Sequence, residues 1–493
     1  MLLSLVVFLP LLGALVLAGA RTSDRTARIV AVVFAALPLV LLALVWSRFR
    51  GGPGFEQVDV VRWMPSVGAS YIVGVDGFSL PLAAMSALLF LAAIAYPVDL
   101  RGRARAYYAL FLFLESASLG VFLALDLLLF YVFFDLSLVG MYFLIGVWGH
   151  GEEGRRAALK FFLYTLAGSL AMLLAILGLY LASSPHTFDM ARLIRERPLD
   201  GDGLRATLVF LGFAIGFAIK TPMVPFHTWL PAAHVEAPAP ASTILAGVLL
   251  KMGTYGFVRI LLAMMPAAFQ RLALPLAVLA VVSILYGALV GLGQPNIKRR
   301  IAYTSVNHMG YAMLGIAAAG AMVSGHAAER ALALTGATVE MVAHGLITGA
   351  LFLMTGSIWM RAQSYEMSEF GGLARKTPSL TVGAALAAFA SLGLPGLAGF
   401  VAEFQIFAGT FAVYPALAAI GLTGIVITAA LFLQLLQRVF LGPLPKLWSG
   451  WPDLHPIEIA ALTSLLVPVV LIGVAPAWLL HVIETMTTAL VGR

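Results

Sequence analysis

The chain has 493 residues, of which 61% are apolar and only 11% are charged. Soluble proteins carry about 25% charged residues, so this composition excludes a water-soluble fold and makes the lipid bilayer, not a nucleic acid, the expected partner. Cysteine is absent, which removes disulfides, thiolate-held iron–sulfur clusters and CxxCH haem attachment. The formal net charge is +7, and its distribution between membrane spans is more informative than its size.

Apolar runs recur along nearly the whole chain. Because about 20 apolar residues cross the hydrocarbon core, these runs predict an all-α polytopic membrane protein of about fourteen transmembrane helices. The first run has no basic segment before it and is longer than the apolar part of a signal peptide, so we interpret it as the first helix. The expected spans are residues 2–20, 28–47, 75–97, 107–125, 127–148, 160–182, 206–232, 241–265, 272–293, 300–320, 331–358, 378–414, 417–440 and 457–490.

Basic residues between the spans alternate along the chain. The odd-numbered connections contain them, as Arg101, Arg103 and Arg105 illustrate, whereas the fourth and twelfth connections have none. The positive-inside rule then places the odd connections in the cytoplasm and both termini in the periplasm of a bacterial inner membrane. Residues 48–74 and 184–206 depart from this pattern, because each contains several arginines on the predicted outer side.

Proline and glycine interrupt two of the predicted spans. Pro222 and Pro225 interrupt the seventh span, and Pro395 interrupts the twelfth. Proline removes an N–H group and clashes with the carbonyl four residues back. Such breaks persist at membrane depth only where protein or a water-filled cavity satisfies the freed groups. A kink without function is the alternative, since helix breakers are common in membrane spans.

The positions of the two breaks indicate an internal repeat. They lie five helices apart, and an odd spacing reverses the direction of crossing, so we expect two inverted five-helix repeats that each contain a broken helix, a pattern typical of transporters. The chain is then divided into residues 1–106 with helices 1–3, residues 107–265 with the first repeat of helices 4–8, residues 266–440 with the second repeat of helices 9–13, and residues 441–493 with helix 14.

Ionisable residues lie at membrane depth near both breaks. Lys220 precedes the first break and Glu403 follows the second, while Lys251, His308 and His344 lie within other spans. A charge at the bilayer centre costs about 2.5–3.5 kcal/mol even on the lenient insertion scale, so these groups need partners or water. Lysine and histidine take up and release protons as their surroundings change. Each residue alone is also explained by a permanent ion pair or an interhelical hydrogen bond, but the combination favours proton transport.

Two carboxylates flank a short connection at Asp126. Glu115 lies 11 residues before it and Asp135 lies 9 residues after it. With a rise of 1.5 Å per residue, an antiparallel hairpin would place them at about the same depth. We expect them to share one site, in which mutual repulsion leaves one negative charge for Lys220. Positions on opposite faces of the hairpin would contradict this hypothesis.

Other polar residues are secondary candidates. His227, His234 and Glu236 follow the first break and are auxiliary residues, which serve either to restart the helix or to line a proton route. His150 flanks a basic connection and is expected to be solvated. Asp126 lies at a span end and is expected to cap the following helix.

The segments that contain these residues closely resemble the antiporter-like membrane subunits of respiratory complex I, the proton-pumping NADH:quinone oxidoreductase. The resemblance covers nearly the whole chain and implies that a fifth-helix glutamate pairs with a seventh-helix lysine, and that protons pass along the eighth, tenth and eleventh helices to the twelfth. The similar segments are FAIKTPMVPFHTWLPAAHVEAPAPASTILAGVLLKMGTYGFVR at 217–259, DLLLFYVFFDLSLVGMYFLIGVWG at 126–149, IKRRIAYTSVNHMGYAMLGI at 297–316, AHGLITGALFLMTG at 343–356 and GLPGLAGFVAEF at 393–404. The matching positions are Asp135, Lys220, Lys251, His308, His344 and Glu403.

Two features favour the M-type branch, also called chain 4, within this family. Glu403 stands where L-type and N-type subunits and Mrp antiporter subunits usually have lysine, and the chain lacks the long C-terminal lateral helix of L-type subunits. One position departs from the family pattern, because Asp135 replaces the usual glutamate and is one methylene shorter. The resemblance therefore implies a looser or water-bridged contact with Lys220.

The resemblance also implies a role and partners. Protons would move from cytoplasm to periplasm, coupled to quinone reduction elsewhere in the complex, beside L-type and N-type neighbours. NADH, FMN, iron–sulfur clusters and quinone are expected in partner subunits, while this chain is expected to hold no cofactor or metal, having no GxGxxG motif after a strand. The alternatives are a subunit of an Mrp-type cation/proton antiporter, the membrane part of a hydrogenase, and a structural membrane subunit.

Overall fold

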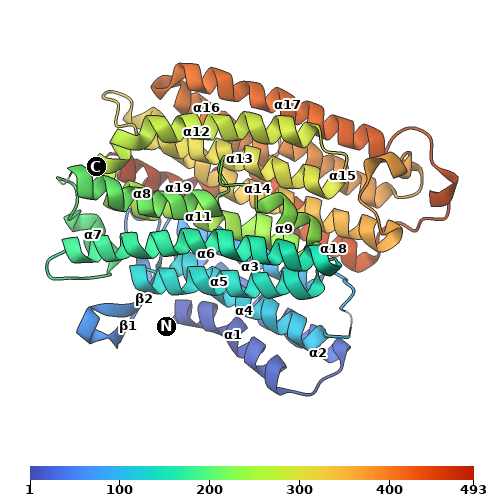
Figure 1. The fold of residues 1–493 in the computed structure, drawn as a ribbon, viewed down its shortest axis with the longest axis horizontal. Coiled ribbons are helices and arrows are strands. Elements are labelled where there is room, and N and C mark those ends of the chain that lie inside the picture. The colour runs from blue at the N-terminus through green and yellow to red at the C-terminus, as the bar shows by residue number, and fades with distance from the viewer. Residues whose placement is uncertain (101, 202, 493) are drawn as a thin grey trace.

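Long helices packed side by side make up most of the computed structural model, which describes residues 1–100, 102–201 and 203–492 (Figure 1). Arg101, used above in the charge pattern, lies outside the described residues. In these ranges eleven helices are long and apolar enough to cross a membrane, and four shorter apolar helices accompany them. The expectation of a polytopic helical membrane fold is confirmed.

The first half of the chain contains most of the helices on one side of the bundle. Its helices are α1 (Leu2–Gly19), α2 (Asp24–Arg48), α3 (Ser79–Ala95), α4 (Ala104–Leu123), α5 (Leu127–Trp148), α6 (Gly151–Ala182), α7 (Met190–Glu196) and α8 (Gly203–Lys220). The short helix α9 (Leu230–Glu236) follows the first break. A single span then consists of α10 (Ala239–Ile244), a π-helical turn (Leu245–Leu249), α11 (Leu250–Gly256) and a second π-helical turn (Phe257–Leu262).

The second half forms the other side. Its helices are α12 (Pro266–Leu292), α13 (Ile297–Gly320), α14 (Ala327–Ala362), α15 (Pro378–Ser391), α16 (Ala398–Val413), α17 (Pro415–Val439), α18 (Pro456–Val474) and α19 (Ala477–Val491). Short 3₁₀ turns occur at Pro65–Val67, Met367–Glu369, Leu373–Arg375 and Lys446–Trp448. The expected span 457–490 is in fact two helices, because the chain turns at Pro476, which precedes the first residue of α19.

An antiparallel β-hairpin departs from the all-α prediction. It consists of β1 (Glu56–Met64) and β2 (Ala69–Val75), with Val60 opposite Ile72. Both segments are rich in β-branched residues, which favour strands, and Gly68 in the turn has φ +72°, a conformation that glycine adopts without strain. The hairpin lies almost wholly within residues 48–74, which were expected to form a connection between spans, so it adds two strands that the all-α class does not include.

The connections gather at the two ends of the bundle. The N-terminus, the hairpin, α7 and the C-terminus lie at one end (Figure 1), where the Met1 amino group pairs with Asp59 of β1. At the opposite end, Arg105 of α4 donates a hydrogen bond to the carbonyl of Ala20, which follows α1, at 2.8 Å. Successive long helices therefore run from one end to the other, as membrane spans do.

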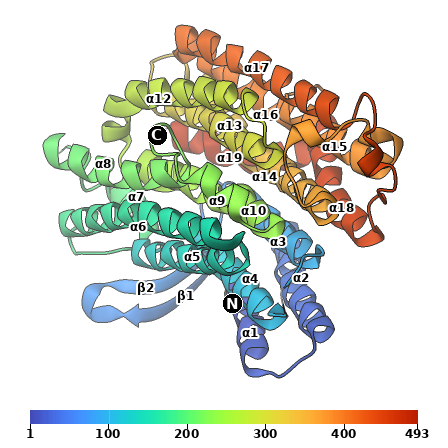
Figure 2. The same ribbon diagram turned by 45° about the vertical axis from the view of Figure 1, so that its right-hand side comes forward.

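Two spans form the centre of the molecule. Figure 2 shows α1, α2 and the hairpin on one side and α12, α16 and α17 on the other. Between them lie the α10–α11 span and α14, whose most apolar 18-residue windows are completely buried. Polar side chains on these two spans therefore face other helices instead of lipid.

Candidate functional site

Protein groups satisfy the backbone at the first helix break. Pro222 and Pro225 follow α8 and lie in the turn before α9. The N–H of Val224 donates to Ser283 Oγ of α12 at 3.0 Å. On the other side α11 approaches so closely that a Cβ on Gly253 would stand 2.6 Å from a carbonyl oxygen of α8. The interruption is thus held between two neighbouring helices, which is the condition for a break at membrane depth.

Lys220 ends α8 inside the bundle, with 1% of its surface exposed. Its Nζ donates to Ser137 Oγ of α5 at 3.2 Å and lies 4.8 Å from the centre of the Phe134 ring. Asp135 also interacts electrostatically with Lys220, but no direct ion pair joins them in the part of the chain that the structure describes. The two groups therefore act on each other through space.

The expected shared carboxylate site is not formed. Glu115 is fully buried on α4, and neither of its carboxylate oxygens has a hydrogen-bond partner among the described residues. Two turns further along that face, the Phe122 ring packs against the Tyr255 ring of α11, with 5.4 Å between the ring centres. Asp135 instead lies beside Ser169 of α6. Glu115 thus faces the centre of the bundle, whereas Asp135 faces α6.

Lys251 of α11 and His344 of α14 are in direct contact. Lys251 Nζ lies 2.6 Å from His344 Nδ1, and it also donates to the carbonyl of Ala246 at 2.5 Å. His344 Nε2 has no hydrogen-bond partner among the described residues. Because an ammonium group donates and an unprotonated ring nitrogen accepts, a proton can move along this contact without a change of fold. The π-helical turns on both sides of Lys251 are of a kind often found at functional sites.

His308 of α13 lies between the Lys251–His344 pair and the second break, and these three residues together with Glu403 and the nearby Glu340 of α14 form the central cluster. Its ring centre lies 5.4 Å from that of His344. Nδ1 lies 2.7 Å from the Thr304 carbonyl, while Nε2 lies 2.8 Å from the Ser391 carbonyl and 3.9 Å from Glu403 Oε1. A neutral imidazole donates from only one nitrogen, so uptake of a proton gives this ring a second hydrogen bond.

The Glu403 carboxylate packs against the turn that forms the second break. Pro395 lies in the turn between α15 and α16, and Glu403 is in the second turn of α16. Gly393 in the same turn has φ +75°, and a Cβ on it would stand 2.4 Å from Glu403 Oε2. A larger residue at this position would be strained and would displace the carboxylate.

The auxiliary residues on α9 form a second polar group. His234 is fully buried and stacks on the Phe352 ring at 4.5 Å. Lys298 of α13 donates to two carbonyls at the end of α9. Glu236 Oε2 lies 3.7 Å from His150 Nδ1. His150 is therefore partly enclosed by protein, while 31% of its side-chain surface stays exposed.

Two further predicted residues lie apart from the cluster. His227 packs against the Tyr286 ring of α12 at 4.9 Å. Asp126 Oδ1 accepts hydrogen bonds from the N–H groups of Leu128 and Leu129 at 2.9 and 3.0 Å. The predicted capping role of Asp126 is confirmed.

Comparison with known proteins places the chain in a family. Residues 124–428 match the family described as NADH:quinone oxidoreductase/Mrp antiporter, transmembrane. Over 489 residues the chain is 36% identical to subunit M of NADH-quinone oxidoreductase from Rickettsia prowazekii, with 97% of this chain and 96% of the relative covered. The chain belongs to the NADH-quinone oxidoreductase subunit M family. The predicted M-type branch is therefore confirmed.

Solved structures agree with this membership. The fold matches a chain of respiratory complex I from Thermus thermophilus with a TM-score of 0.88 and 32% identity, and all of both chains is covered. A chain of the Mrp complex from a Dietzia species matches with a TM-score of 0.86, covering 98% of this chain and 96% of that one. Its identity of 22% shows a shared fold alone.

Three buried polar residues of this subunit M family member were not predicted. Ser137 is the direct contact of Lys220, Lys298 lies at the end of α9, and Glu340 is a fully buried carboxylate on α14. Glu340 lies four residues before His344, so the helical spacing was a usable signal. Lys298 lies in a predicted basic connection between spans, so its charge was interpreted only as part of the positive-inside pattern.

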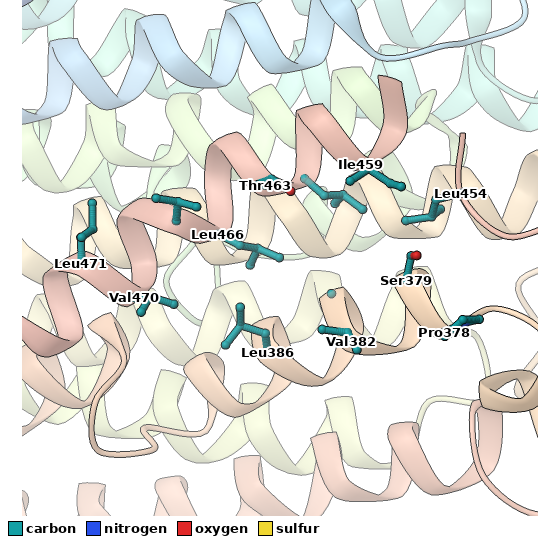
Figure 3. A pocket seen from close by; sticks show the side chains of 13 residues that line it. Pro378, Ser379, Val382, Leu386, Leu454, Ile459, Thr463, Leu466, Val470 and Leu471 are labelled. Atoms are coloured by element: carbon teal, nitrogen blue, oxygen red, sulfur yellow. The ribbon is translucent and has the colours of Figure 1, made fainter. Parts of the chain in front are cut away.

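The candidate site is distinct from the large surface groove of this subunit M family member. That groove has a volume of about 600 Å³ and lies between α15 and α18, where Leu386 faces Leu466 and Val470 (Figure 3). Its lining is almost entirely apolar. Among the described residues, no group of three or more His, Cys, Asp or Glu side chains is arranged to hold a metal ion.

Proposed function

We propose that this chain is a proton-translocating membrane-arm subunit of NADH:quinone oxidoreductase and that its buried lysines, histidines and Glu403 carry the protons. The observation that carries the proposal is the line of contacts from Lys251 through two histidines to Glu403. Burying several ionisable side chains at membrane depth costs free energy. Proton transfer between these side chains explains why neighbouring helices carry them close together.

The first half of the relay acts as the control point. An ammonium group is favoured while a carboxylate charge lies nearby and is disfavoured when that charge moves away. Quinone reduction elsewhere in the complex changes the Asp135–Lys220 interaction, and Lys220 then releases its proton toward Lys251. The Ser137 hydroxyl lies on this route, since it contacts Lys220 Nζ and also lies 3.7 Å from the sulfur of Met252, the next residue after Lys251.

The second half delivers the proton. Lys251 passes it to His344, His308 accepts it, and Glu403 releases it toward the periplasm. His234, Glu236 and His227 are auxiliary residues in this scheme: the first two lead from the α9 end toward Lys251, and His227 lies beside the first break. Glu115 keeps an auxiliary role at the centre of the bundle.

The orientation and the repeats belong to the same proposal. Residues 107–265 and 266–440 are two inverted repeats, each with one broken helix, within an arrangement of about fourteen spans. The basic connections face the cytoplasm of a bacterial cell and both termini face the periplasm. The gathering of both termini at one end of the bundle supports their placement on the same side of the membrane (Figure 1).

Partners supply the redox chemistry. The matching Thermus thermophilus structure is a complex I with bound NADH. By analogy, NADH, FMN, iron–sulfur clusters and quinone bind to partner subunits, and L-type and N-type subunits flank this chain in the membrane arm. Identification of the chains that co-purify with it distinguishes this assembly from an Mrp-type antiporter or a membrane-bound hydrogenase.

Proton pumping by the whole complex tests the relay. We expect Lys220→Ala and Glu403→Ala each to lower the number of protons taken up per NADH oxidised in inverted membrane vesicles. Glu152→Ala, at a side chain that is 73% exposed, is the control and should pump normally. The amount of assembled complex is measured in parallel. Normal pumping in both relay variants would overturn the proposal.

A further inference from the structure

Glu340 of α14 is a buried carboxylate that the relay described above does not use. Only 1% of its surface is exposed, and neither of its carboxylate oxygens has a hydrogen-bond partner among the described residues. An ionised carboxylate without hydrogen bonds is costly in a protein interior. Its presence on a completely buried helix therefore calls for a function.

The packing of α14 places Glu340 between two parts of the relay. One turn before it, Gly336 packs on α16 so closely that a Cβ would stand 2.6 Å from a backbone nitrogen of that helix. One turn after it, His344 contacts Lys251. The Glu340 carboxylate interacts electrostatically with both Lys251 and Glu403. It thus lies on the side of α14 that joins the lysine to the glutamate of the second break.

The charges of these groups balance only if the carboxylates hold a proton. An ammonium on Lys251 neutralises one negative charge, and Glu340 and Glu403 would together supply two. Like charges at close range in an apolar interior are unfavourable. One proton on the two carboxylates makes the group neutral, and that proton has two alternative positions.

The histidine route has a constraint that a carboxylate route lacks. Both ring nitrogens of His308 face backbone carbonyls at 2.7 and 2.8 Å. Transfer through this ring to Glu403 therefore requires it to give up a hydrogen bond. The oxygens of Glu340 have no such partners to lose; they also lie beyond hydrogen-bond distance of Lys251 and Glu403, so each transfer requires the Glu340 side chain to turn toward its partner.

We propose that Glu340 is a proton-carrying residue that receives a proton from the Lys251 ammonium and passes it to Glu403. In the first step an N–H bond of Lys251 breaks and an O–H bond forms on Glu340, which leaves a neutral amine and a carboxylic acid. Glu403 holds the shared proton at the start and releases it toward the periplasm; in the second step the O–H bond on Glu340 then breaks as a new one forms on Glu403, and no electrons are exchanged. This inference rests on the relay function proposed above.

The test compares three variants of α14 in the complete complex. Glu340→Gln keeps the shape but cannot carry a proton, Glu340→Asp keeps the acid, and Glu329→Gln makes the same chemical change at a side chain that is 42% exposed. The rate of proton uptake is measured in inverted membrane vesicles that oxidise NADH and contain equal amounts of assembled complex. We expect Glu340→Gln to slow pumping roughly tenfold or more, as loss of an acid–base group does, Glu340→Asp to recover part of it, and Glu329→Gln to pump normally.

The outcomes separate this inference from the relay itself. Normal pumping in Glu340→Gln together with defective pumping in Glu403→Gln would overturn the role of Glu340 and leave the relay intact. Normal pumping in both would overturn the relay as well. An aspartate variant as defective as the glutamine variant would show that restoring an acid at this position does not restore pumping and would also overturn the inference.

Discussion

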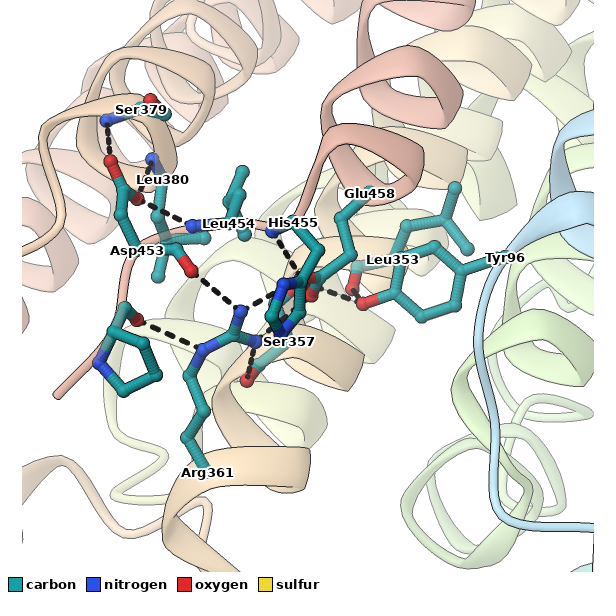
Figure 4. Close-up of polar contacts among 11 residues, drawn as sticks. Tyr96, Leu353, Ser357, Arg361, Ser379, Leu380, Asp453, Leu454, His455 and Glu458 are labelled. Atoms are coloured by element: carbon teal, nitrogen blue, oxygen red, sulfur yellow. Dashed lines mark hydrogen bonds and ion pairs between the residues drawn. The ribbon is translucent and has the colours of Figure 1, made fainter.

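Two groups of buried charges in this molecule differ in how completely they are partnered. At the end of α14, the Arg361 guanidinium donates to both oxygens of Glu458 at 2.9 and 2.7 Å and to two backbone carbonyls beyond α17 (Figure 4). Ser357 donates a further hydrogen bond to Glu458 at 2.6 Å. In the central cluster, by contrast, the oxygens of Glu340 and one ring nitrogen of His344 have no partner among the described residues.

This difference separates structural charges from mobile ones. A fully hydrogen-bonded pair such as Arg361–Glu458 has little to gain from a change in protonation, because each proton is already held between donor and acceptor. In the central cluster, Glu340 and His344 keep unused donors or acceptors, so a proton can move onto them without the loss of an existing hydrogen bond. We therefore interpret the fully hydrogen-bonded Arg361–Glu458 pair, called the clamp below, as structural, and the incompletely partnered groups as members of the proposed relay.

Breaking the clamp should have the largest effect on stability. Arg361→Met leaves the Glu458 carboxylate buried and unpaired, and removal of one partner from a buried pair costs about 3–5 kcal/mol. We expect less assembled complex and a lower thermal unfolding temperature. Complex that does assemble should take up the normal number of protons per NADH oxidised. A lower ratio at unchanged stability would assign the pair to the relay instead.

Lys251→Met should give the opposite pattern. Loss of the ammonium removes a proton carrier, so we expect pumping to fall roughly tenfold or more. Because Glu340 and Glu403 can take up a second proton when the ammonium charge is lost, we expect the unfolding temperature to fall less than in Arg361→Met. The measurements are vesicle acidification and thermal unfolding of the same preparation. A large fall in unfolding temperature with normal pumping would contradict the comparison.

Gly393→Ala should have an intermediate effect. The new Cβ strains a backbone at φ +75° and meets the Glu403 carboxylate. Gly396→Ala is the matched control, because its φ is +91° and no atom lies within 4 Å of the added Cβ. Both variants carry the cost of the left-handed conformation, about 1–2 kcal/mol, but only the first should slow pumping severalfold. Equal rates in the two variants would show that the position of Glu403 tolerates displacement.

The smallest expected effect concerns Asp453, in the connection before α18. Although burial alone would raise the pKa of this carboxyl group, hydrogen bonds from the backbone N–H groups of Ser379, Leu454 and Leu380 hold it below its ordinary value. The stabilisation is therefore present above about pH 4 and is lost as the pH falls through the lowered pKa. Asp453→Asn should lower the unfolding temperature at pH 7, and the difference from wild type should shrink below about pH 4. A constant difference would contradict this account.

Local signals predicted much of the fold. Hydropathy placed the spans, and proline and glycine located both interruptions, because length, apolarity and missing N–H groups act within one segment. The β-hairpin was not predicted, since it lies in a connection that the membrane pattern does not describe. The turn before Pro476 was missed because the apolar run continues through it.

The candidate site was predicted only as a set of residues. The sequence by itself determined that this chain enters a membrane and carries lysines, histidines and carboxylates at depth, because apolar length and residue identity are properties of single segments. Only the tertiary structure decided which of them meet: Lys251 and His344, 93 residues apart, are in contact, whereas Glu115 and Asp135 face different helices. The rotation of each helix about its axis and the close approach of its neighbours set these pairs, and no local pattern encodes either.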